Sequence, residues 1–386
     1  MVAPRHAYVH VPFCARRCTY CDFAIAVRRS VPVDEYLIAL GRELEIRRPL
    51  EGARLDTLYF GGGTPSRLGG EGIVRAVDLV RRYATLDPGA EITIEANPED
   101  VSHDAVAAWS AAGVNRVSLG VQSFDDAALR WMHRVHDSER ARRAAEAIRE
   151  AGIANLSLDL IFALPSSVPR SWPGDVEQTL ALQPSHLSLY GLTIEERTAL
   201  GRALGRGELE PATEESYEQD FLLAHRAMSA AGLEHYEVSS FALPGSRSRH
   251  NSAYWRRVPY AGLGPGAHGL EIVPGPHAGT VRRRRWNEPA YVAWARALER
   301  GEDPVKGSET LSEENETAES VYLGLRTREG LTLQPNEMSM ADLWSREGWA
   351  TIAREGPASS AVLRLTPIGW LRLDSLAASL TTIRSR

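Results

Sequence analysis

The chain has 386 residues, of which 43% are hydrophobic and 24% are charged, which is ordinary for a water-soluble globular protein with a sizeable core. Its formal net charge of -6 argues against a dedicated nucleic-acid binder, because such proteins carry a basic excess. No apolar run approaches the roughly 20 residues that span a bilayer, and the start, MVAPRHAYVHVPFC, lacks the apolar core of a secretory signal. These observations leave peripheral membrane contact open.

Short β-rich runs alternate with helical patterns through the first 231 residues. Strands are expected at 6–11, 55–60, 91–96, 115–121, 155–162 and 186–192, and helices at 34–49, 70–84, 105–111, 126–132, 138–151, 175–182 and 214–231. Strands that alternate with helices in this way predict an α/β fold with a parallel sheet and crossover helices.

Polar and special residues follow the ends of the expected strands. Cys14 follows the first strand, GGGTP (61–65) follows the second, Glu95 and Asn97 end the third, Gln122 ends the fourth, and Asp159 lies late in the fifth. Ligand-binding residues of parallel sheets gather at this edge, because the loops after the strands meet there. The coincidence of these positions predicts one ligand-binding or active site.

Beyond residue 231 the alternation stops. EHYEVSSFAL (234–243) is expected as one strand, AGLGPGAHG (261–269) as a close-packed loop, and VRRRRW (281–286) as a solvated strand or hairpin face. A helix over 288–300 and a linker, GEDPVKGS (301–308), indicate a boundary near residue 303. The tail, with helices at 313–326, around 338–353 and from Pro367, and a strand at 362–366, is expected to form a small α/β domain.

All three cysteines of the chain, Cys14, Cys18 and Cys21, lie within eight positions with the spacing C-x3-C-x2-C. They cannot form a disulfide framework, which indicates the reducing cytoplasm as the compartment. A structural zinc site needs four ligands, and His10 would have to supply the fourth from the strand side of the loop. Iron–sulfur clusters are held by thiolates from closely spaced loop cysteines. We therefore favour a [4Fe-4S] cluster with one open iron over zinc and over three incidental thiols.

The cysteine loop after a first strand resembles that of the radical S-adenosylmethionine (radical SAM) superfamily. The resemblance implies that the open iron binds the methionine moiety of S-adenosylmethionine (SAM), which the reduced cluster cleaves to a 5′-deoxyadenosyl radical. GGGTPS (61–66) resembles the methionine-binding glycine motif of the superfamily. On the residues alone, a glycine run is more often a tight turn between a strand and a helix.

Six motifs in chain order resemble the family of oxygen-independent coproporphyrinogen III oxidase and the haem chaperone HemW: YVHVPFCARRCTYCDF, GGGTPS, IEANPE, RVSLGVQSF, LDLIFALP and RHNSAYW. The resemblance implies an open partial (β/α)6 barrel over residues 1–232, an extension over 233–303 and a small α/β C-terminal domain over 304–386. It implies that Tyr8, Gly62 and Glu95 contact the cluster-bound SAM. The positions that contact a second SAM in the oxidase match Tyr20, Gly63, Thr64, Gln122, Arg134 and Asp159.

Three features separate the members of this family. The oxidase has a further cysteine where this chain has Phe23, and an N-terminal extension that is not expected here because Cys14 comes so early. RHNSAYW (249–255) matches the HNxxYW motif associated with haem binding in HemW, which implies His250 as a haem ligand. On residue chemistry alone, a polar turn at His250 with core-packed aromatics is the more frequent arrangement. His10 and His268 are weaker alternatives as ligands.

The resemblance therefore implies a haem chaperone that binds a [4Fe-4S] cluster, SAM and haem and delivers haem to haemoproteins such as respiratory cytochromes. The alternative is a coproporphyrinogen III oxidase, which decarboxylates propionate side chains by radical chemistry. A haem carrier does not require radical chemistry, so enzymatic activity is left open, as is a homodimer. The basic run Arg282–Arg285 is expected to be solvated, with pairing to porphyrin propionates as a second interpretation.

Overall fold

The computed structural model describes residues 2–275, 279–355 and 360–385. Its largest sheet has nine strands, which in spatial order are β11 (Ala261–Leu263), β1 (His6–Val11), β4 (Arg54–Gly62), β5 (Thr85–Ala96), β6 (Arg116–Gln122), β7 (Asn155–Phe162), β8 (His186–Gly191), β10 (Ser240–Ala242) and β9 (Glu234–Glu237). The strands from β11 to β8 run parallel, and β10 and β9 add an antiparallel hairpin. This confirms the expected α/β fold with six parallel strands in chain order.

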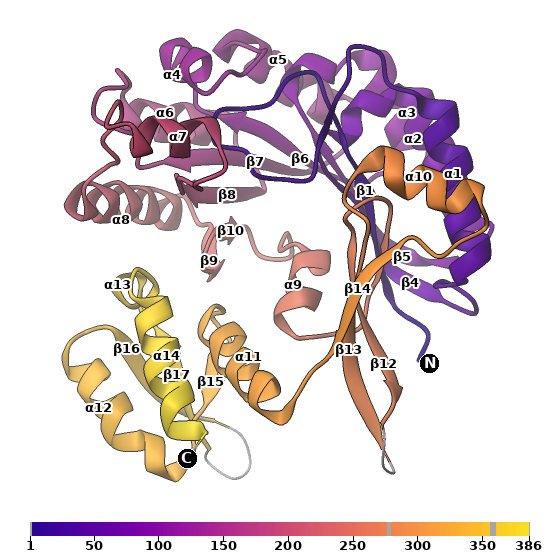
Figure 1. Ribbon diagram of the computed structural model, residues 1–386. Helices are drawn as coiled ribbons and strands as arrows, with labels where there is room; N and C mark the ends of the chain where they lie inside the picture. The colour runs from indigo at the N-terminus through magenta and orange to yellow at the C-terminus, as the bar shows by residue number, and fades with distance from the viewer. Residues whose placement is uncertain (1, 276–278, 356–359, 386) are drawn as a thin grey trace.

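The sheet curves into an arch whose outer side is covered by helices (Figure 1). These are α1 (Val33–Arg47), α2 (Gly69–Arg81), α3 (His103–Ala111), α4 (Asp126–Trp131), α5 (Ser138–Glu150), α6 (Trp172–Ala181) and α8 (Glu214–Ala230). In α2 the buried residues Ile73, Ala76, Val77 and Val80 recur at helical spacing, so one face of the helix packs on the sheet. The core of the arch is therefore the layer between strands and outer helices, and the inner side is left for a site.

A second sheet, of which the sequence predicted only a strand or hairpin face at 281–286, extends from the arch below β1 in Figure 1. It is antiparallel and consists of β12 (His268–Pro274), β13 (Thr280–Asn287) and β14 (Val305–Thr310). Helix α9 (Arg249–Trp255) lies between the sheets, and α10 (Tyr291–Glu299) packs beside α1. The second half of the segment expected as a linker, 301–308, therefore belongs to β14, and a domain boundary at residue 303 would separate β14 from β13.

Two further expectations are corrected in this region. Residues 234–243 form the β9–β10 hairpin rather than one strand, with a register shift at Ser240. Residues 261–269 are not only a loop, because β11 pairs in parallel with β1 and β12 begins at His268. A Cβ on Gly262 would lie 1.9 Å from the His268 carbonyl oxygen, so the glycine permits this close crossing of two strands.

The C-terminal part has its own core. Helices α11 (Glu313–Leu325), α12 (Met338–Arg346) and α14 (Leu373–Arg384) pack on a sheet of β15 (Leu331–Thr332), β17 (Ser360–Leu365) and β16 (Ala350–Glu355). The expected helix around 338–353 is thus too long, because Gly348 adopts φ 74° just after α12 and the chain turns into β16. The short helix α13 (Pro367–Trp370) precedes α14.

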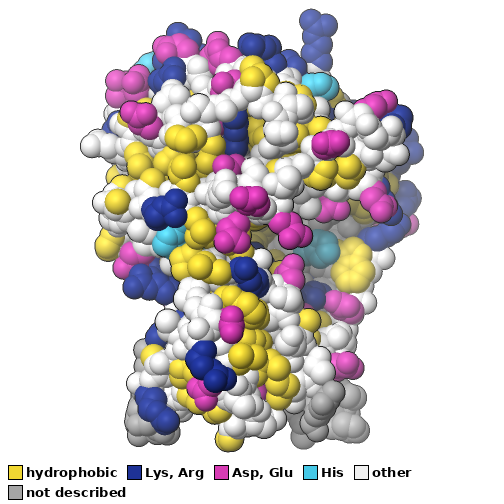
Figure 2. Space-filling view, turned by 90° about the vertical axis from the view of Figure 1, so that its left-hand side faces the viewer, with side chains coloured by type: hydrophobic (Ala, Val, Ile, Leu, Met, Phe, Trp, Pro, Cys, Tyr) yellow, Lys and Arg dark blue, Asp and Glu magenta, His cyan; other side chains and the backbone are white. Residues whose placement is uncertain are grey.

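The C-terminal part meets the arch along a seam that is partly open. Backbone hydrogen bonds join Val238 to Arg326 and Arg328 to Tyr236 across it. Beside these lies a cavity of about 660 Å³ between β8, α8 and the start of α14. Figure 2 shows this side as a hollow between the upper and lower bodies with acidic side chains gathered around it. No helix in the described ranges is long and apolar enough to cross a membrane.

Candidate functional site

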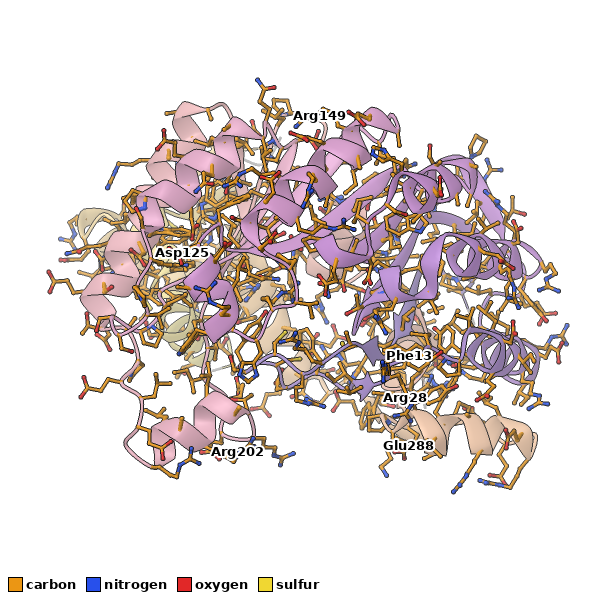
Figure 3. The ribbon with its side chains drawn as sticks, turned by 90° about the horizontal axis from the view of Figure 1, so that it is seen from above. Phe13, Arg28, Asp125, Arg149, Arg202 and Glu288 are labelled. Carbon is orange, nitrogen blue, oxygen red and sulfur yellow. The ribbon has the colours of Figure 1, made fainter. Side chains whose placement is uncertain are left out.

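The loop that carries the cysteines is fixed at both ends and stretches across the mouth of the arch. Two short strands, β2 (Phe13–Cys14) and β3 (Ala26–Val27), pair in parallel and hold its ends together. In the middle, Thr19 donates its backbone N–H to Met132 and accepts one from Leu200 in the helix α7 (Ala199–Gly205). Figure 3 shows the molecule from above, with Phe13, Arg28 and Glu288 on one side and Asp125 and Arg202 on the other.

The three cysteines are half-buried free thiols that line one cavity of about 460 Å³ under this loop. Thr64 Oγ1 lies 3.4 Å from Cys14 Sγ, and Arg134 Nη1 lies 3.7 Å from Cys18 Sγ. Burial raises the pKa of Cys14 to about 11 and also raises the pKa of Cys21, so both thiols are protonated at neutral pH before a metal binds. Binding of a metal centre must displace these protons, which couples its affinity to pH.

The donor set fits an iron–sulfur cluster better than a single ion. Within the part of the chain that the structure describes, no group of three His, Cys, Asp or Glu residues is placed to bind a single metal ion. A cubane cluster does not require its ligands to converge on one ion, because each thiolate binds a different iron. The neighbouring Arg134 side chain, whose Nε is buried without a partner, adds positive charge beside what would be an anionic cluster.

The glycine run after β4 forms the wall of the cavity next to Cys14. Gly62 has φ 111°, and a Cβ there would lie 2.4 Å from the ring of His10. A Cβ on Gly63 would lie 2.6 Å from the carbonyl carbon of Pro12. Both positions therefore need glycine for conformation or space, and their backbone groups face the cavity.

Glu95 is the carboxylate at the end of β5. Tyr59 Oη donates a hydrogen bond of 2.8 Å to its Oε1, and the Gly62 N–H donates one of 3.0 Å to its Oε2. Burial nevertheless raises the pKa of Glu95 to about 7, and the nearby charge of Asp159 adds to the rise. A cationic ligand group in the cavity would stabilise the ionised form of Glu95.

Polar groups from β6, β7 and the α4–α5 connection form the opposite wall. Asp159 accepts hydrogen bonds from Ser118 Oγ at 2.9 Å and Ser157 Oγ at 3.2 Å, while burial raises its pKa to about 6. Arg134 donates to Asn97 Oδ1 at 2.6 Å and to the Gly120 carbonyl at 2.9 Å. Gln122 has φ 68°, an unfavourable conformation for a residue with a Cβ, at the cavity.

The structure thus brings together nearly all the residues that the sequence singled out. One cavity is lined by Cys14, Cys18, Cys21, Tyr20, Gly62, Gly63, Thr64, Glu95, Gln122, Arg134 and Asp159. Tyr8 instead lines a second, adjoining cavity, together with Gly62 and Glu95. The sequence did not predict roles for Ser118, Ser157 and Tyr59. The only feature of the sequence that could have indicated them is that each lies at an inward-facing position of a strand that carries a site residue.

His250 lies outside both cavities. Its side chain is fully buried, Nδ1 lies 2.6 Å from Thr57 Oγ1, and Nε2 lies 2.7 Å from Tyr254 Oη. Its ring stacks on Tyr59 with 4.9 Å between centroids, and burial lowers its pKa to about 3. Both ring nitrogens are engaged in this arrangement, so a role as haem ligand remains a prediction that requires these bonds to open.

The basic run on β13 is neutralised by acidic partners. Its four arginines form ion pairs, which are Arg282–Glu316, Arg283–Glu271, Arg284–Glu319 and Arg285–Asp303. The expectation of a strand face is confirmed. Because each guanidinium already forms an ion pair with a carboxylate of the chain, these arginines are less available to pair with porphyrin propionates than the sequence indicated.

Comparison with known proteins places the chain in a family. A family model for the radical SAM superfamily matches residues 8–173. Haem chaperone HemW of Mycobacterium tuberculosis is 39% identical over 335 residues, which cover 86% of this chain and 83% of that protein. HemW of Escherichia coli is 37% identical over 302 residues, or 78% of each chain. The chain belongs to the HemW family of radical SAM proteins.

The solved structure of coproporphyrinogen III oxidase (HemN) from Escherichia coli, a radical SAM enzyme, has the same fold. It matches with a TM-score of 0.79 over 98% of this chain and 90% of that chain, at 23% sequence identity. At this identity the likeness concerns the fold alone. It covers 98% of this chain and therefore includes most of the arch, the second sheet and the C-terminal part.

The raised pKa of Glu95 predicts a pH dependence of stability. The unfolded carboxyl titrates near 4.5 and the folded one near 7, so the native state binds more protons between these values. The free energy of unfolding of the cluster-free protein should therefore fall from pH 4.5 to 7 relative to that of Glu95→Gln. Denaturant titrations at pH 5 and pH 8 measure this, with the exposed Glu71→Gln as control. Equal pH dependence in wild type and Glu95→Gln would refute it.

Proposed function

We propose that this protein is a haem chaperone that binds a [4Fe-4S] cluster, SAM and haem and passes haem to haemoproteins, respiratory cytochromes among them. The observation that carries the proposal is the 39% identity to a HemW protein over 86% of the chain. The free, clustered thiols indicate the cytoplasm as the compartment, since they need a reducing environment. A carrier of haem does not need to be an enzyme, and we propose no turnover of SAM.

Each wall of the cysteine cavity has a role in this proposal. Cys14, Cys18 and Cys21 would hold the cluster, which when bound supplies an iron with a free coordination position. Glu95, held by Tyr59 and the Gly62 N–H, would accept the ammonium group of SAM. Gly62 and Gly63 allow close approach of backbone to the ligand.

The opposite wall of the cysteine cavity would contact the rest of the SAM molecule. Thr64, Gln122, Arg134 and Asp159, with Tyr20 from the loop, line the same cavity and would contact SAM away from its methionine end. The carboxyl of Asp159, surrounded by serine hydroxyls, is suited to accept hydrogen bonds from ribose hydroxyls. A measurement of the number of SAM molecules bound per chain would show whether these residues bind one SAM or two.

The alternative function is that of a coproporphyrinogen III oxidase, whose family the sequence motifs also resemble. Phe23 argues against it, because it stands where the oxidase has a further cysteine. Phe23 projects from the cysteine loop with 63% of its surface exposed. An exposed phenyl ring gives a surface for an apolar ligand or a partner and no thiol chemistry.

Two assays separate the functions. Anaerobically reconstituted protein should bind ferric haem with a Soret band distinct from free haem and should transfer it to apomyoglobin, an acceptor that any haem donor can fill. The same protein with SAM and dithionite should leave coproporphyrinogen III unchanged. Formation of protoporphyrinogen IX would establish the oxidase function, and failure to bind haem would reject the chaperone function.

A further inference from the structure

Two of the three cysteine thiols have a hydrogen-bond partner in the walls of the cysteine cavity. Thr64 Oγ1, just after β4, lies 3.4 Å from Cys14 Sγ. Arg134 Nη1, in the connection between α4 and α5, lies 3.7 Å from Cys18 Sγ. A thiolate that binds iron has no proton, so the wall group must be the donor at both contacts once a cluster is held.

One amide side chain joins these two donors. Asn97, directly after β5, donates from Nδ2 to Thr64 Oγ1 at 3.3 Å, and its Oδ1 accepts from Arg134 Nη2 at 2.6 Å. The threonine hydroxyl already accepts the amide N–H, so its single proton remains for the neighbouring thiolate. Arg134 Nη2 also donates to the Gly120 carbonyl at 2.9 Å, which leaves Nη1 directed at the second thiolate. The amide of Asn97 thus orients both donors.

The position of Asn97 is itself fixed by its surroundings. Pro98 follows it and restricts Asn97 to an extended backbone, with φ -96° and ψ 144°. The Asn97 N–H donates to Ser66 Oγ at 3.1 Å, and Ser66 donates to Asp100 Oδ2 at 2.8 Å. A Cβ on Gly120 would lie 3.2 Å from Asn97 Oδ1, so the glycine leaves space for the amide. Asn97 is therefore held firmly enough to set the direction of its neighbours.

The guanidinium of Arg134 has no carboxylate partner of its own. It forms no ion pair among the described residues, and its Nε is buried without a hydrogen-bond partner. Glu99, a carboxylate of the same cavity, pairs instead with His136 at 3.3 Å. A cation that is removed from water is costly unless an anion lies beside it. A cluster bound by three thiolates carries net negative charge and would supply that anion.

We propose that Thr64 and Arg134 are hydrogen-bond donors to the cluster thiolates, and that Asn97 is the positioning residue that directs both of them and so raises the reduction potential of the cluster. Hydrogen bonds to sulfur and nearby positive charge stabilise the reduced cluster more than the oxidised one, because the added electron makes it more negative. The proposal rests on the proposed function, in which the cysteines hold a [4Fe-4S] cluster, and specifies how the chain sets the redox property of that cluster.

The first test measures the midpoint potential of the cluster without SAM or haem. Anaerobically reconstituted protein is titrated with titanium(III) citrate, which donates the electron, and the reduced cluster is followed by electron paramagnetic resonance. Asn97→Ala should lower the midpoint potential, because both donors lose their orientation. Asn97→Asp should lower it further, because its carboxylate adds negative charge and accepts the Thr64 proton that the Cys14 thiolate would otherwise receive.

Variants of threonine isolate the contribution of one hydroxyl. Thr64→Val should lower the midpoint potential, and Thr64→Ser, which retains the hydroxyl, should keep it near the wild-type value. The control Thr193→Val removes a hydroxyl that lines the same cavity beyond β8 and should leave the potential unchanged. Each variant should bind about four irons per chain, as the wild type does. Loss of iron from Thr64→Val and Thr64→Ser alike would overturn the role of the hydroxyl.

The second test detects the hydrogen bonds themselves. Iron–thiolate stretching bands in the resonance Raman spectrum shift in heavy water when exchangeable protons bond to the sulfurs, and this shift should be smaller in Thr64→Val and Asn97→Asp than in the wild type. Wild-type potentials in both variants, or an equal change in Thr193→Val, would overturn the proposal and leave the chaperone function intact. Wild-type protein that takes up no cluster would overturn the proposal together with the cluster, whereas absence of haem binding rejects the chaperone function alone.

Discussion

Replacing any one of Cys14, Cys18 and Cys21 with serine is expected to abolish the cluster. The iron content after anaerobic reconstitution should fall from about four per chain to below about one, with loss of the broad charge-transfer absorption. The chain has no other cysteine that could substitute as a ligand. A serine hydroxyl does not ionise at neutral pH and is a poor ligand for iron, so the remaining two thiolates cannot retain the cubane. Iron and sulfide analysis with absorption spectroscopy measures this.

The matched control for the serine variants is a substitution at Phe23, two positions beyond Cys21. Phe23→Cys adds a fourth thiol to the same loop at an exposed position and should leave the iron content at about four, because three thiolates suffice. Wild-type protein that purifies with one zinc and takes up no iron would contradict the cluster assignment. So would a serine variant that retains full iron content.

The site at the edge of the parallel sheet was predictable from the sequence for a physical reason. The parallel strands β1 and β4 to β8 alternate with helices, and the loops after parallel strands must meet at one edge. Cys14, Glu95 and Asp159, which end or follow three different strands, therefore had to face one cavity, as they do. Their thiol and carboxyl groups then indicated a site that binds a metal cluster and a polar ligand.

The second half of the chain was less predictable because its structure depends on distant contacts. Strand β11 has three residues and exists because it pairs with β1, more than 250 positions earlier. The RHNSAYW segment has no periodic pattern that places His250, whose burial results from Thr57 on β4 and Tyr254 on its own helix. The same holds for His268, whose position beside Trp286 follows from a β-pairing that no local signal indicates.

The second large effect is expected at Glu43, a fully buried carboxylate on α1. It forms an ion pair with Arg47 and accepts hydrogen bonds from Asn287 Nδ2 at 2.7 Å and from Trp294 Nε1 at 3.0 Å. The Gly264 N–H donates a further bond of 2.8 Å. One side chain thus ties α1 to β11, to the end of β13 and to α10.

Glu43→Ala is expected to lower the free energy of unfolding by about 3–5 kcal/mol, because it removes the ion-pair partner of the buried Arg47. It also removes the acceptor of the Trp294 Nε1–H and Gly264 N–H groups. Glu43→Gln retains the shape and one acceptor oxygen and should cost less. Denaturant unfolding followed by tryptophan fluorescence measures the change. The control is Glu51→Ala, which removes an exposed carboxylate paired with the exposed Arg48 and should change stability by less than about 1 kcal/mol.

The contacts of Glu43 also reach the second cavity, because Asn287 is both a partner of Glu43 and a residue that lines this cavity. Asn287 also donates to the Gly264 carbonyl at 2.8 Å, so the loop between β11 and β12 depends on the same contacts. Equal losses of stability in Glu43→Ala and Glu51→Ala would show that the buried network does not stabilise the fold.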